Sequence, residues 1–216
     1  MDIAVIGSTG SGKSTLINLI PRYYDVTKGS VKVDGVDVRD MTQKELRDKL
    51  GYVPQKGVLF SGTIDSNIRY GKPEITDSQV KEAAEVAQAT EFIDTKPEKY
   101  ESPVSQGGTN VSGGQKQRLS IARAIAKDPE IFIFDDSFSA LDFKTDSQLR
   151  KALKEYTKDA TTVIVAQRIS TILGADQIIV LDDGHMAGIG THKELMANCE
   201  VYQQIARSQL SEEELA

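Results

Sequence analysis

The feature that most constrains this chain is a glycine-rich segment close to its beginning. Residues 7–14 read Gly-Ser-Thr-Gly-Ser-Gly-Lys-Ser and match the pattern G-x-x-x-x-G-K-[ST]. The apolar run Ile3–Ile6 before them predicts a buried strand, and Lys13 to Ile20 predict a helix that Pro21 ends. A glycine-rich loop between a strand and a helix turns successive backbone N–H groups toward an anion. The sequence therefore predicts a site for a nucleoside triphosphate.

Side chains of this loop have separate expected roles. Lys13 is expected to reach the β and γ phosphates, and the Ser14 hydroxyl is expected to bind Mg²⁺. A glycine-rich turn that matches by chance is the alternative, and the flanking strand and helix argue against it. The predicted nucleotide-binding residues here are Gly7, Ser8, Thr9, Gly10, Ser11, Gly12, Lys13, Ser14 and Thr15.

A second acidic motif follows an apolar run. Ile131–Phe134 predict a buried strand, and Asp135 and Asp136 come directly after it. Acids at the carboxyl end of such a strand lie where ligands of α/β sheets bind, so Asp135 is expected beside Mg²⁺. An Asp that caps a helix is the alternative interpretation.

The order of predicted elements indicates the fold class. Continuous apolar runs at 131–134 and 162–166, separated by a helix, predict parallel strands buried on both faces. From about 61 to 126 helical signals dominate, including a capping box at Thr76. Capping boxes at Thr42 and Thr191 predict two further helices, the first running through Leu50 with a loop from Val53. We therefore predict an α/β fold with a mainly parallel sheet, in which 1–60 and 127–216 form the core and 61–126 form a helical subdomain.

Composition and charge exclude several classes of protein. No run of eighteen apolar residues occurs, so no transmembrane span is predicted. The net charge of −6 argues against general binding of nucleic acid, which depends on Lys and Arg neutralising phosphates. The single cysteine, Cys199, excludes an internal disulfide and a cysteine-rich metal site.

Residues 111–118 read Val-Ser-Gly-Gly-Gln-Lys-Gln-Arg and resemble the signature motif of ABC ATPases. The 23 positions from Ser112 to Asp135, and Ser139–Asp142 as a D-loop, are similar to this family. Val53-Pro54-Gln55 resembles its Q-loop, and residues 58–64 after it are typical of exporters rather than importers. The resemblance extends over essentially the whole chain.

This resemblance implies a P-loop NTPase (RecA-like) core with an ABC-type helical subdomain, bound to ATP and Mg²⁺. It also implies a head-to-tail dimer with a homologous domain, in which ATP lies between the loop of one chain and the signature of the other. The signature residues in that role would be Ser112, Gly113, Gly114 and Gln115, and the metal ligands would be Ser14, Gln55 and Asp135. The expected activity is ATP hydrolysis coupled to export, on the cytoplasmic face of the plasma (inner) membrane, together with the transmembrane domain of an exporter.

Two positions depart from the family pattern. Where active members have a Glu that orients the attacking water, this chain has Asp136, whose carboxylate falls back by roughly 1.5 Å. Where the family has a His that contacts the γ-phosphate, this chain has Gln167, which cannot carry positive charge. With Gln55 these are the predicted catalytic residues, and His185 and His192 are interpreted as structural. Slow hydrolysis is therefore expected, as in the degenerate half of a heterodimeric exporter, with neutral variation in a slow homodimer as the alternative.

The family also has antiparallel strands and an adenine-stacking aromatic residue before the phosphate loop. Only six residues precede Gly7 here, so we expect these strands to be truncated, as in a piece of a longer polypeptide. Two other functions fit the motifs. A non-hydrolytic module that uses ATP to lock a dimer is one, and a DNA-repair type ABC ATPase is the other. The second needs a long coiled coil, and residues 62–111 show no sustained heptads.

Overall fold

The computed structural model describes residues 1–210, which fall into two compact units. The first unit comprises residues 1–50, 133–136 and the described residues from Thr161 onward. The second comprises Gly51–Phe132 and Ser137–Ala160. The subdomain boundaries expected from the sequence, 61–126 for the helical part, stay a prediction.

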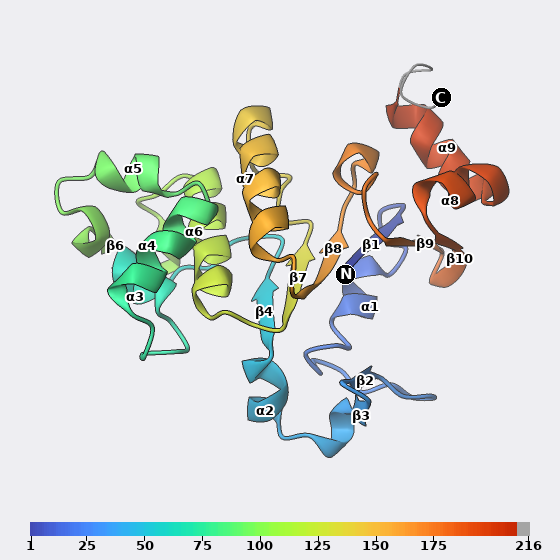
Figure 1. Cartoon of the computed structure of the whole chain (residues 1–216), viewed down its shortest axis with the longest axis horizontal. Coiled ribbons are helices and arrows are strands. Elements are labelled where there is room, and N and C mark those ends of the chain that lie inside the picture. Colours follow the sequence, from blue (N-terminus) through green and yellow to red (C-terminus); the bar gives the residue numbers. More distant parts are fainter. Residues whose placement is uncertain (211–216) are drawn as a thin grey trace. The chain divides into compact units, whose positions relative to one another are not determined.

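A mainly parallel sheet is the centre of the first unit. Its strands follow the order β10-β9-β1-β8-β7, and β1 pairs in parallel with both β8 and β9. Strand β10 pairs antiparallel with β9 across the turn at Asp183-Gly184. Figure 1 shows β1 between β8 and β9 in this arrangement. The predicted α/β class is confirmed, and the strand bounds are β1 Asp2–Gly7, β7 Ile131–Asp135, β8 Thr161–Val165, β9 Gln177–Asp182 and β10 His185–Gly190.

The core of this unit forms where the sheet meets two helices. The helices are α8 (His192–Asn198) and α9 (Glu200–Gln209), and Tyr202 and Ala206 of α9 are fully buried with Ile178 and Val180 of the sheet. The predicted capping box at the start of α8 is present: the Thr191 side chain accepts from the Glu194 N–H and the Glu194 side chain accepts from the Thr191 N–H. Cys199 is buried in the same core.

The first unit also contains several short helices and strands. They are α1 (Lys13–Ile17), β2 (Lys32–Val33), β3 (Val36–Asp37), the 3₁₀ turn η1 (Val38–Asp40), α2 (Gln43–Asp48) and η4 (Ile169–Thr171). Helix α1 ends earlier than the predicted Ile20, because the chain tightens into i to i−3 hydrogen bonds, from Leu19 N–H to Leu16 and from Ile20 N–H to Ile17.

The sequence also misplaced the end of α2. It predicted a helix through Leu50 and a loop from Val53, whereas α2 ends at Asp48 and strand β4 (Leu50–Val53) follows at once. Leu50, Gly51 and Val53 are buried in this strand. The helix and the strand are joined by one residue, so the apolar run of the strand extended the helical pattern.

The second unit is mainly helical. Its longest helices are α6 (Gly113–Ala126) and α7 (Phe143–Tyr156), and α4 opens with the predicted capping box at Thr76. Within residues 1–210 no helix is both long and apolar enough for a membrane span. The remaining elements are α3 (Ile64–Ile68), α4 (Asp77–Val86), α5 (Thr90–Asp94), η2 (Lys99–Glu101), η3 (Gln106–Gly108), β5 (Gly62–Thr63) and β6 (Pro103–Val104).

Candidate functional site

The glycine-rich loop connects β1 to α1 as the sequence predicted. Gly7 is the last residue of β1, and a Cβ there would lie 2.2 Å from the Leu181 carbonyl oxygen, so only glycine fits. Gly10 and Gly12 have φ of 82° and 96°, a left-handed conformation that glycine adopts without strain. Ser8, Thr9 and Gly10 are exposed at the crest of the loop. The backbone at this crest is therefore open to a ligand.

Lys13 folds back over the loop that precedes it. Its Nζ donates hydrogen bonds to the carbonyl oxygens of Gly7, at 2.9 Å, and of Ser8, at 2.8 Å. Burial lowers the pKa of Lys13, and the carboxylates of Asp136 and Asp135 act in the opposite direction. The ammonium group thus lies at the loop, within the field of two acids.

The first residues of α1 meet the acid at the end of β7. Ser14 Oγ donates to Asp135 Oδ1 at 2.9 Å, across a separation of 121 residues. Asp135 is 7% exposed, whereas Ser14 and Thr15 are exposed. A hydroxyl and a carboxylate are therefore together beside the loop, the kind of donor set that Mg²⁺ takes along with phosphate oxygens.

The two residues that depart from the family pattern are in direct contact. Gln167 Nε2 donates to Asp136 Oδ2 at 2.6 Å. Asp136 is 8% exposed, has φ of 48°, and its backbone N–H donates to the Val165 carbonyl oxygen at 3.0 Å. The backbone of Asp136 is thus held by the end of β8, and its side chain is held by the residue two positions further along that segment.

The hairpin between β9 and β10 also supports the loop, which the sequence reasoning missed. The Gly184 N–H donates to the Ser11 carbonyl oxygen at 3.2 Å. The Ser11 hydroxyl is buried and has no hydrogen-bond partner within the described chain. A buried hydroxyl without a partner costs free energy unless a ligand or water satisfies it, and this one lies inside the predicted cradle.

The signature residues open helix α6 in the second unit. The Ser112 side chain accepts from the Gln115 N–H at 3.2 Å, and Gln115 Oε1 accepts from the Ser112 N–H at 3.1 Å. A Cβ at Gly113 would meet nothing within 4 Å, and one at Gly114 would come no closer than 3.5 Å to the Ala140 carbonyl oxygen. Gly113 therefore faces open space at the start of a helix of fourteen residues, an arrangement suited to an anion, whereas a Cβ at Gly114 would lie at ordinary contact distance from Ala140.

Helix α6 also holds the segment that carries Gln55. Gln117 is 1% exposed; its Oε1 accepts from the Gly57 N–H at 2.9 Å and its Nε2 donates to the Pro54 carbonyl oxygen at 3.1 Å. The Ser137 hydroxyl donates to the Val53 carbonyl oxygen at 2.9 Å. Gln55 is exposed between these fixed points. Sequence reasoning did not find Gln117, because a glutamine on the buried face of a helix has no distinctive pattern.

The two histidines have structural contacts. His192 Nδ1 lies 2.7 Å from Tyr202 Oη, and His185 Nδ1 lies 2.9 Å from the Asp183 carbonyl oxygen. The contact of His192 ties the start of α8 to buried Tyr202 of α9.

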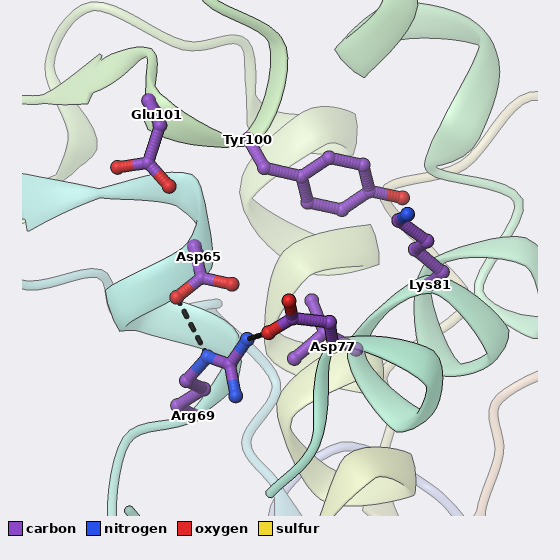
Figure 2. Close-up of a pocket in the computed structure, with 7 residues that line it drawn as sticks. Asp65, Arg69, Asp77, Lys81, Tyr100 and Glu101 are labelled. Atoms are coloured by element: carbon purple, nitrogen blue, oxygen red, sulfur yellow. Dashed lines mark hydrogen bonds and ion pairs between the residues drawn. The ribbon is translucent and has the colours of Figure 1, made fainter.

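A cavity of about 320 Å³ in the second unit has a different character (Figure 2). One wall of the cavity is formed by Arg69, whose Nε donates to Asp65 Oδ2 at 2.7 Å and whose Nη2 pairs with Asp77. Its Nη1 donates to the Ile75 carbonyl oxygen, and the hydrogen bond to Asp65 is the main cause that raises the pKa of Arg69. Because the guanidinium already has these partners, Arg69 links the end of α3 to the start of α4 and is not an unpaired cation. Its lining residues are Asp65, Arg69, Asp77, Val80, Lys81, Tyr100 and Glu101.

Comparisons with known proteins agree with the motifs. An uncharacterized ABC transporter ATP-binding protein of Mycobacterium bovis is 50% identical over 209 residues, which cover 95% of this chain and 36% of that protein. A putative multidrug export ATP-binding/permease protein of Staphylococcus aureus is 47% identical over 203 residues, which cover 94% of this chain and 35% of that protein. The chain thus spans about a third of the length of these relatives.

A solved structure has the same fold. The structure of a bacterial Atm1-family ABC exporter with ATP bound matches with a TM-score of 0.93 and 39% sequence identity, over 98% of this chain and 37% of that chain. The fold is therefore that of an ABC ATPase domain, a P-loop NTPase with a mostly parallel sheet, as predicted. A family model described as ABC transporter matches residues 2–139. Since this match covers more than half of the 216 residues, the chain belongs to the ABC transporter family.

Proposed function

We propose that this chain is the ATP-binding domain of an ABC exporter, which dimerises around ATP and hydrolyses it slowly at its own site. The observation that carries the proposal is the hydrogen bond from Ser14 Oγ to Asp135 Oδ1 at 2.9 Å. It lies next to the glycine-rich loop, to which the Lys13 ammonium group also donates. In this proposal the backbone of residues 8–12 and the Lys13 ammonium hold the phosphates of ATP. Ser14 and Asp135 would hold Mg²⁺, and the bound ion would neutralise part of the phosphate charge.

The second unit supplies the reason to propose a dimer. The start of α6, with Ser112 and Gly113 exposed, is suited to a second anion on a chain that already has one phosphate loop. A second anion site needs a second nucleotide, so we infer that Ser112, Gly113, Gly114 and Gln115 complete the site of a homologous domain. A heterodimer is favoured because two copies of this chain would have two slow sites, each with Asp136 and Gln167. A different partner domain with Glu and His at these positions would supply one efficient site.

The place of the chain in the cell is inferred from its relatives. One of them is named as a multidrug export ATP-binding/permease protein, and this chain covers 35% of it. We infer that the chain works with the transmembrane domain of an exporter, at the cytoplasmic face of the plasma (inner) membrane, and not on nucleic acid.

Slow hydrolysis follows from the contact between Asp136 and Gln167. Gln167 donates to Oδ2 of Asp136, so one acceptor position of this carboxylate is directed at Gln167 and not at an attacking water. The carboxylate of Asp is also one methylene shorter than that of the Glu in active members, and an error near 1 Å in alignment costs about a hundredfold in rate. The same contact favours the second candidate function, a non-hydrolytic module that uses ATP to lock a dimer.

The paired substitution Asp136→Glu with Gln167→His tests this proposal. We expect single-turnover cleavage of Mg-ATP to rise roughly 10- to 100-fold, because the longer carboxylate and the imidazole restore water orientation. Because the two side chains touch, their effects on the single-turnover rate are expected to be coupled. The fold increases of the two single variants, multiplied together, should therefore be smaller than the fold increase of the paired variant. Unchanged cleavage with intact ATP binding would favour the non-hydrolytic module, and fast multiple turnover by the unmodified chain would contradict slow hydrolysis.

A further inference from the structure

The segment that carries Gln167 is held by the far end of the chain's last described helix. Gln209, the final residue of α9, accepts from the Ile169 N–H through Oε1 at 2.9 Å. Its Nε2 donates to the Gln167 carbonyl oxygen at 2.8 Å. One side chain therefore binds the backbone on both sides of Arg168, across 40 and 42 residues of sequence.

The chemistry of this contact requires an amide. The backbone of Arg168 is extended, with φ of −106° and ψ of 127°, so the carbonyl before it and the N–H after it point to the same side, as at a position in a β ladder. A primary amide has one acceptor and a donor group on the same carbon, so it can satisfy both at once. A carboxylate would keep the acceptor and lose the donor.

Both ends of the contact are fixed. Helix α9 is anchored by Tyr202 and Ala206, which are fully buried, and Ile169 is fully buried in the same core. On the other side of Gln167, the Ala166 N–H donates to the Val5 carbonyl oxygen of β1 at 3.1 Å. The backbone of residue 167 is thus fixed on one side by the sheet and on the other by Gln209.

We propose that Gln209 is a positioning residue for the nucleotide site: it sets the backbone of residue 167, and through it the contact with Asp136. This inference rests on the proposed function, since it assigns Gln209 to the same site. Gln209 does not touch the reacting atoms in this proposal. Its effect passes entirely through the two backbone hydrogen bonds, which are independent of the side chain at position 167.

The test compares Gln209→Ala with Gln203→Ala in the full 216-residue chain. Gln203 is a matched control, because it lies on the same helix and its Nε2 also donates to a backbone carbonyl, that of Met196, at 2.9 Å. Hydrogen exchange of the Ile169 amide is measured by mass spectrometry or NMR. We expect exchange to rise about 3- to 10-fold for Gln209→Ala and to stay unchanged for Gln203→Ala.

A functional measurement is made in the background of Asp136→Glu with Gln167→His, where cleavage is expected to be measurable. There we expect Gln209→Ala to lower the single-turnover rate about tenfold, with the Kd for Mg-ATP changed less than twofold. Gln209→Glu keeps the acceptor and loses the donor. Its single-turnover rate is expected to lie between the rate of the background variant and that of Gln209→Ala. A purely structural role would instead lower the rate and the thermal stability equally for Gln203→Ala and Gln209→Ala.

Unchanged exchange at Ile169, or an unchanged rate despite faster exchange, would overturn the assignment of Gln209. If the background variant binds Mg-ATP without cleaving it, the proposed function fails instead. In that case the exchange of the Ile169 amide still tests the role of Gln209. Faster exchange in Gln209→Ala than in Gln203→Ala would show that Gln209 holds the backbone of residues 167–169.

Discussion

Lys13 shows how the site is arranged at the scale of single residues. Its ammonium group donates to two neutral carbonyl oxygens, those of Gly7 and Ser8. A hydrogen bond from an ammonium to a phosphate oxygen is charge-assisted and roughly twice as strong as one between neutral groups. Phosphates bound at the loop would therefore compete well for Lys13, and the side chain needs only a small rotation because it already lies over the loop.

Lys13→Ala is expected to weaken binding of Mg-ATP roughly 10- to 100-fold, the usual effect of losing a hydrogen bond to a charged group. Calorimetric titration measures the change in Kd, and Lys28→Ala serves as the control because Lys28 is exposed in the same unit. An equal loss of affinity in both variants, or none in Lys13→Ala, would contradict the role of Lys13.

At the scale of elements, α6 supports much of the second unit with polar side chains. Arg123 donates to Asn67 O at 2.8 Å, to Asn67 Oδ1 at 2.9 Å and to Val58 O at 2.9 Å. Its guanidinium carbon lies 5.2 Å from the centre of the Phe60 ring and 5.4 Å from that of Tyr70, and these rings stack on each other. Burial lowers the pKa of Arg123 to about 10. The planar guanidinium thus organises the chain from Val58 to Tyr70.

We expect Arg123→Lys to destabilise this unit by about 2 kcal/mol, even though it keeps the charge. A lysine has no planar fork, so it cannot bond all three acceptors at once or stack on the two rings. Denaturant unfolding gives the change in free energy, with exposed Lys151 on α7 substituted by Arg as the control. A change below about 0.5 kcal/mol, the range of ordinary surface substitutions, would show that the fork is dispensable.

Local sequence signals predicted many elements, because their causes lie within a few residues. The capping boxes at Thr42, Thr76 and Thr191 each join residues three positions apart, and all three are present. Strand β4 was missed, since it adjoins the end of α2 without a turn.

The site was predictable only in part. The motif around Lys13 is local, and so it could be predicted. The contact between Asp136 and Gln167 joins residues 31 positions apart, so two separate departures could be predicted but not the hydrogen bond between them. The contacts of Gln117 and Gln209 span 40 to 63 residues and depend on how the fold returns the chain to itself. The roles of the signature residues and of Gln55 stay predictions.

At the scale of the whole molecule, the proposal requires that each nucleotide be held between two domains. A complementation experiment tests this requirement with two variants of this chain, which take the places of the two halves of the favoured heterodimer. One chain carries Asp136→Glu, Gln167→His and Gly113→Asp, so its phosphate loop is competent and its signature repels phosphate. The other carries Lys13→Ala alone and keeps its signature. Asp at the start of α6 is favourable for the helix, and a side chain at Gly113 meets nothing within 4 Å, so the fold is expected to tolerate it.

Neither chain alone is expected to cleave ATP, and a 1:1 mixture is expected to do so. Random pairing makes about half of the dimers mixed, each with one live site, so the mixture should reach about a quarter of the rate of chains that carry Asp136→Glu and Gln167→His only. A steady-state assay of phosphate release measures these rates. Activity of the first chain by itself, at a rate unaffected by Gly113→Asp, would mean that the signature serves no second chain.

Gln117 gives the second unit a mechanical property. The peptide from Pro54 to Gly57 is attached at both ends to one buried side chain, two residues past the Gln115 that closes the capping box of α6. Displacing the exposed Gln55 away from α6 would therefore require breaking the two hydrogen bonds of Gln117, or moving the start of α6 along with the loop. A ligand bound at Gln55 would in this way act, through one buried amide, on the helix that the signature residues open.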